Sequence, residues 1–217
     1  EDEAKRVRLL YDDSVTTPSV FRSGGYQEAR TRLTVLAMLF AVVSEYDGEI
    51  RWKKDARAAR DVCARTARNS QSGTIQVFNE AKQRKADLQD LMSGASIAAR
   101  GDETANDWSI IADRVPLMTY AEEVLDALSD LTRDAATTEG DADVIVQYAD
   151  MLAILGVALQ QDGMDDSDDP DYAALSKAMT DASAGVKDAV RSERWGDLRT
   201  EVGKVSQSCV TCHDDYR

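Results

Sequence analysis

The chain has 217 residues, 43% of them hydrophobic and 30% charged, and its formal net charge at pH 7 is −14. A charge of this sign disfavours nucleic acid and anionic membrane surfaces as partners. With only three prolines and many alanines and aspartates, the composition predicts a soluble, largely helical protein of one or two domains. We expect no membrane span, because no stretch reaches the roughly 18 apolar residues required, and no signal peptide is evident.

The charge is divided unevenly along the chain. Residues 1–100 carry 17 Lys or Arg against 14 Asp or Glu, a net charge of +3. Residues 101–217 carry 9 against 26, a net charge of −17. Such asymmetry predicts two units, 1–100 and 101–217.

In the first half, apolar residues at helical spacing predict helices over 1–12, 26–46, 52–69 and 74–92. Asp47-Gly48 and Ser93-Gly94 end the second and the fourth of these helices. Cys63 lies on the apolar side of its helix, so we expect a buried thiol that packs as a small hydrophobic residue.

In the second half, the pattern predicts helices over 108–133, 141–161, 171–190 and 193–217. Pro116 should either kink the first of these helices or mark its true start. Four amphipathic helices with short connections predict an all-α fold, an antiparallel four-helix bundle. The first half has a similar order of helices, which indicates a second bundle, a degenerate duplicate; alternatively, its helices extend or cover a single bundle.

The last nine residues contain Cys209-Val210-Thr211-Cys212-His213, a C-x-x-C-H motif that is the attachment signature of a c-type haem. Two thiols at this spacing can add to the two vinyl groups of one porphyrin, and the adjacent imidazole can ligate its iron. Because His213 is the only histidine, a haem with two histidine ligands is excluded.

The motif continues a helical stripe. Seven residues recur at spacings of 3, 4, 3, 4, 3 and 4, which is typical of the inward face of a helix in a bundle. They are Trp195, Leu198, Val202, Val205, Cys209, Cys212 and Tyr216. We therefore expect a haem held within a helical bundle.

Three other interpretations of the two cysteines remain open. A thioredoxin-like redox pair requires a strand before the motif and a helix after it, whereas here the chain continues for only a few residues. A structural zinc site requires four ligands, and the nearest further candidate, Cys63, is distant in sequence. The third interpretation is a chance match.

The motif Cys209, Cys212, His213, Tyr216 and Arg217 has the form C-x-x-C-H-x-x-[YF]-R on a final helix. In this respect the chain resembles the cytochrome c prime family and its low-spin, methionine-ligated relatives. The resemblance implies a four-helix bundle with one haem c attached through the two thiols and ligated by the histidine. It also implies that Arg217 tunes the proximal side of the haem.

A second mark of that family is an arginine on the first helix whose fourth following residue faces the distal side of the iron. Arg114 and Met118 match this pattern, although Pro116 between them is a departure. The resemblance implies that Met118 ligates the iron, as in the low-spin relatives, and that Arg114 pairs with a propionate or caps the pocket. Alternatively, Met118 is a core residue and the distal site is open.

The function implied by the resemblance is electron transfer in the bacterial periplasm by a c-type cytochrome. The alternative is a five-coordinate haem protein that binds nitric oxide or carbon monoxide. An enzyme is disfavoured because no second histidine is available as a distal acid or base. The acidic surface predicts a redox partner with a basic docking face, and the family implies a possible homodimer.

Overall fold

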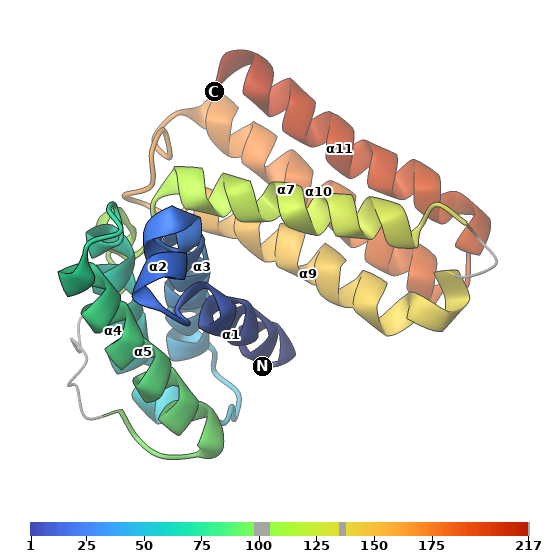
Figure 1. The fold of residues 1–217 in the computed structure, drawn as a ribbon. Coiled ribbons are helices and arrows are strands. Elements are labelled where there is room, and N and C mark those ends of the chain that lie inside the picture. The colour runs from blue at the N-terminus through green and yellow to red at the C-terminus, as the bar shows by residue number, and fades with distance from the viewer. Residues whose placement is uncertain (98–104, 135–137, 217) are drawn as a thin grey trace. The chain divides into compact units, whose positions relative to one another are not determined.

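The computed structural model describes residues 1–97, 105–134 and 138–216 and is all-helical, with no strand among these residues. The predicted all-α class is thereby confirmed. The chain forms two compact units, Glu1–Leu117 and Met118–Arg217 (Figure 1). The boundary predicted between residues 100 and 101 falls in 98–104, outside the described residues.

The first unit is built mainly from four helices, α1 (Asp2–Ser14), α3 (Tyr26–Glu45), α4 (Ala56–Asn69) and α5 (Ile75–Ser93). They pack in a ring, because α3 contacts α1 and α4, and α5 contacts α4 and α1. Shorter segments connect them: α2 (Pro18–Val20), a π-helical turn (Phe21–Gly25) and a 3-10 turn (Lys53–Asp55).

Helix α3 forms the centre of the first unit. Apart from its ends it is buried on all sides, including every residue from Thr31 to Ala41. The helices around it are bounded by local signals: the Thr74 side chain accepts a hydrogen bond from the Val77 N–H at the start of α5. Gly94 ends α5 with a φ of 102°, in the left-handed region that glycine tolerates best.

A short helix, α6 (Trp108–Ile111), also belongs to the first unit and packs against α3 and α4. Its two end residues, Trp108 and Ile111, are buried. Before it, the Asn106 side chain contacts the Arg60 guanidinium at 2.5 Å. After it, Arg30 forms an ion pair with Asp113 at 2.7 Å. These contacts explain why the first unit extends past residue 100.

The predicted helix over 108–133 is in fact two helices, α6 and α7 (Arg114–Leu131). The break is at Ala112, whose φ of −144° and ψ of 136° are extended. Pro116 is the third residue of α7, where its missing N–H would have no partner within the helix. Of the two predicted roles, Pro116 therefore marks the true start.

The second unit contains the rest of α7, together with α9 (Ala142–Leu159), α10 (Pro170–Arg191) and α11 (Leu198–Asp215). Short 3-10 turns, Glu139–Asp141 and Trp195–Asp197, precede α9 and α11. Helix α10 packs against both α9 and α11. The chain direction alternates from each helix to the next, as the prediction of an antiparallel bundle requires (Figure 1).

The premise that no stretch is long and apolar enough to span a membrane was wrong. The segment Glu139–Leu159 is long and apolar enough by composition to cross a bilayer. One such segment is weak evidence for a span, because the core helix of a bundle passes the same test. Here α9 buries residues such as Leu152 and Leu155 and packs against α10.

The backbones of α9 and α10 approach each other closely at Gly156. A Cβ atom at this position would lie 2.5 Å from the Thr180 Oγ1 and 2.9 Å from the Ser176 carbonyl oxygen. The absence of a side chain therefore allows the two backbones to approach each other. Gly203 in α11 is also helical, but a Cβ atom there would meet nothing within 4 Å.

We predict opposite effects for alanine at these two glycines. Gly156→Ala should destabilise the second unit by about 1–3 kcal/mol, because the added methyl group overpacks the contact with α10. Gly203→Ala should stabilise it by up to about 1 kcal/mol, because alanine has the higher helix propensity. Differential scanning calorimetry of both variants checks this; equal shifts would show that the α9–α10 contact is not close-packed.

Candidate haem site

The stripe predicted along the last helix is confirmed from Leu198 onward, whereas Trp195, its first predicted member, lies in the 3-10 turn before α11 and is half-buried. Leu198, Val202 and Val205 are buried, and Cys209, Cys212 and Tyr216 further along the same face are half-buried. The intervening positions are mostly exposed. The apolar residues pack α11 against α10, so this packing sets the rotation of the helix and the direction of both cysteines.

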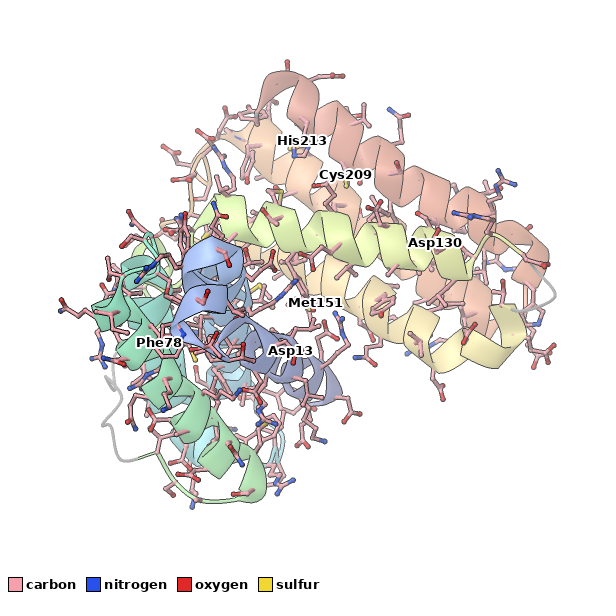
Figure 2. All side chains as sticks on the ribbon, in the orientation of Figure 1. Asp13, Phe78, Asp130, Met151, Cys209 and His213 are labelled. Carbon is pink, nitrogen blue, oxygen red and sulfur yellow. The ribbon has the colours of Figure 1, made fainter. Side chains whose placement is uncertain are left out.

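The two cysteines of the motif lie one turn apart on α11, and neither forms a disulfide. His213 follows on the last turn and is exposed. Figure 2 labels Cys209 and His213 near the C-terminal end of the helix. One turn of helix therefore brings two thiols outside any disulfide close to an imidazole, which follows the first thiol by four residues and is exposed to solvent.

The environment of these thiols differs from that of a redox-active pair. Burial raises the pKa of Cys209 above its ordinary value, with the side chain of Ser208 opposing the shift. Both cysteines lie in the last turns of α11, whose negative dipole end also disfavours a thiolate. Redox cysteines instead gain their low pKa at helix N-termini or beside cations, so the thioredoxin-like interpretation is disfavoured.

The zinc interpretation also lacks support. Within 1–97, 105–134 and 138–216, no group of three or more His, Cys, Asp or Glu side chains is arranged to hold a metal ion. A structural zinc site needs four such ligands. Two thiols that form no disulfide, followed directly by an imidazole, are instead the set of groups that a covalently attached haem requires. The residues present therefore fit that group.

Met118 lies in the second turn of α7 and is half-buried. The 3-4 spacing of the sequence predicts an inward stripe through Ile111, Arg114, Met118, Ala121, Leu125 and Leu128, and of these Ile111, Ala121 and Leu128 are buried. The most buried residues of α7 are Leu117, Tyr120, Ala121, Val124 and Leu128. Arg114, Met118 and Leu125 are half-buried and occupy the margin of this face.

Arg217, predicted to tune the proximal side, lies outside the described residues. The residue before it, Tyr216, joins the end of α11 to the start of α10. Its hydroxyl donates a hydrogen bond to Asp169 at 2.7 Å, and its ring lies edge-on to Tyr172, with centroids 5.1 Å apart. This hydrogen bond is the main reason why the pKa of Asp169 is lowered and the pKa of Tyr216 is raised to about 12.

Asp169 was missed in the sequence, where it is one of many acidic residues in the loop before α10. It accepts a hydrogen bond from the Asp171 N–H at 2.9 Å and so caps α10, whose first residue is Pro170. An aspartate followed by proline is a recognisable start of a helix. Its contact with Tyr216, 47 residues later, has no local signal in the sequence.

The third cysteine is unlike the other two. Cys63 in α4 is buried, as predicted, and burial raises its pKa to about 12. A thiol with these properties is unreactive.

We predict that a thiol reagent at pH 8 will modify the haem-free protein in two phases. Cys209 and Cys212 should react first, because they are half-buried, and Cys63 only after local or global unfolding, orders of magnitude more slowly. Ellman's reagent followed by absorbance measures both phases. Cys63→Ala should remove only the slow phase, and three equally fast thiols would contradict the burial described here.

Comparison with known proteins gives no further identification. No family model, no curated protein and no solved structure matches this chain. The interpretation of the site therefore depends on its own residues and geometry.

Proposed function

We propose that this protein is a c-type cytochrome that transfers electrons through one covalently attached haem c. The proposal is carried by one observation: Cys209 and Cys212, which form no disulfide, are half-buried on one face of α11, and the only histidine of the chain follows them. This supports the resemblance to the low-spin relatives of cytochrome c prime.

Each residue of the site has a distinct role in this proposal. Cys209 and Cys212 form the two thioether bonds, and His213 supplies a neutral imidazole nitrogen as the proximal ligand. Met118, which lies in the same unit, would supply a thioether sulfur as a further iron ligand, and such a ligand favours a high reduction potential. When bound, haem supplies a one-electron iron couple. Arg114 pairs with a propionate or caps the pocket, and Arg217 tunes the proximal side.

A role as an electron carrier requires little further chemistry from the chain, whereas peroxidase or reductase chemistry requires a distal acid or base. His213 is already committed to the proximal position, and the sequence contains no other histidine. We therefore propose a carrier and not an enzyme.

The second candidate is a five-coordinate haem protein that binds nitric oxide or carbon monoxide. One observation favours it: Met118 occupies the margin of the buried face of α7, two residues after Pro116, and not its centre. A methionine at the edge of the face is less constrained toward a ligand than one at its centre. The two candidates differ only in whether Met118 is bound to the iron.

The remaining parts of the proposal concern location and partners. Attachment of haem c in the resembling family takes place outside the cytoplasmic membrane, which supports a periplasmic protein. Residues 118–217 carry 22 Asp or Glu against 8 Lys or Arg, which favours a redox partner with a basic docking face. The four helices of the first unit pack in a ring, which supports the proposal that this unit is a degenerate duplicate of the second unit and binds no haem. We also propose a homodimer.

Replacing methionines on two different helices tests the axial ligand. With Met118 bound, the reduced wild-type protein should be low-spin and unresponsive to carbon monoxide, whereas Met118→Leu should be high-spin and bind the gas. Met151→Leu is the matched control, because Met151 is buried in α9 (Figure 2) and leucine conserves its volume. It should behave as the wild type does. Absorption spectra with and without carbon monoxide measure all three.

A wild-type protein that binds carbon monoxide, unchanged by Met118→Leu, would make the gas-binding candidate correct. Absence of haem bands from every variant would contradict both candidates.

A further inference from the structure

We infer that Asp169 is a positioning residue for the haem: through its hydrogen bond with Tyr216 it holds the turn of α11 that carries His213. The inference rests on the proposed function and adds to it a residue from the loop before α10. That residue lies outside the C-x-x-C-H motif and 44 positions before the histidine.

The need for such a contact follows from where the motif lies. Helix α11 ends at Asp215, so His213 is the third residue from its end. The last carbonyl groups of a helix have no partner within it, and terminal turns fray readily. Thr211, His213, Asp214 and Asp215 are all exposed, so the burial of apolar side chains contributes little to holding this turn.

Tyr216 connects this last turn of α11 to the start of α10. Its backbone N–H donates to the Cys212 carbonyl oxygen at 2.9 Å, which closes the last turn around His213. Its side chain then leaves the helix and reaches the start of α10. There its ring packs edge-on against Tyr172, which is 2% exposed, and its hydroxyl meets the Asp169 carboxylate at 2.7 Å.

The two oxygens of the Asp169 carboxylate have separate partners. Oδ1 accepts the Asp171 N–H at 2.9 Å and caps α10, whereas Oδ2 accepts the Tyr216 hydroxyl. One side chain thus connects the first turn of α10 to the last turn of α11. Hydrogen bonds to a charged acceptor are about twice as strong as those between neutral groups, and the neighbouring aromatic ring limits the movement of Tyr216.

Two substitutions remove this charge-assisted hydrogen bond in different ways. Tyr216→Phe removes the donor but keeps the ring and the charge of the site. Asp169→Asn keeps a good N-cap residue, but with its oxygen on the Asp171 N–H it turns an amide nitrogen toward the Tyr216 hydroxyl, so only a weaker, neutral hydrogen bond can form there. Asp168→Asn is the matched control, because Asp168 is exposed and loses the same charge one position away.

The first measurement is amide hydrogen exchange in the haem-free protein, which needs no cofactor. Tyr216→Phe and Asp169→Asn should each speed exchange of the amides of 212–215 on the order of tenfold, the loss expected for one hydrogen bond. The double variant should be no faster than either single variant, because both remove the same interaction. Asp168→Asn should match the wild type, and the amides of 202–205 should not change in any variant.

The second measurement is the midpoint potential of the haem-loaded variants. Tyr216→Phe should shift the potential without changing the charge, and the shifts in Tyr216→Phe and Asp169→Asn should not add in the double variant. Faster exchange with an unchanged potential would reduce the contact to a structural role and overturn the inference, while the proposed function would stand. Failure of the wild-type protein to take up haem would overturn the proposed function, and with it the positioning role.

Discussion

The second unit depends on the packing of α11 against α10. The buried residues Leu198, Val202 and Val205 fix which face of α11 turns inward, and the same 3-4 spacing carries that face on to Cys209 and Cys212. Because the thiols share the helix face that packs the bundle, their direction is set by the core and not by a loop. The proposed haem site thus lies on a helix, at the point where the buried stripe begins to open to solvent.

The end of the same helix is less well held. His213, the proposed iron ligand, lies on the last turn of α11, and a terminal turn is poorly fixed by its own helix. Helix α10 contacts α11 in two ways. Along its length it packs against α11, and at its N-terminus Asp169 and Tyr172 contact the side chain of Tyr216. At this exposed end of α11, where few side chains are buried, the contacts of Tyr216 with Asp169 and Tyr172 connect the last turn to α10. The first unit is organised differently, around a helix, α3, that is buried on nearly all sides.

The sequence predicted most of the fold, because apolar periodicity and helix-ending residues are local signals. The helices of both halves and the stripe on α11 were found in this way. What the sequence did not reveal was the result of packing between distant segments. Trp108 and Ile111 join the first unit by contacts with α3 and α4, and Tyr216 meets Asp169 across 47 residues. On α7 the predicted inward face was right in part: Ala121 and Leu128 are buried, whereas Arg114 and Met118 are only half-buried.

The central claim is that Cys209 and Cys212 hold one haem covalently. The most direct test is the intact mass of the protein under denaturing conditions, after production behind an export signal in a bacterium that attaches haem c. The account predicts a mass increased by one haem, retained after extraction with acid and acetone and lost when both cysteines are replaced by alanine. An unmodified mass, or haem that the extraction removes, would contradict it.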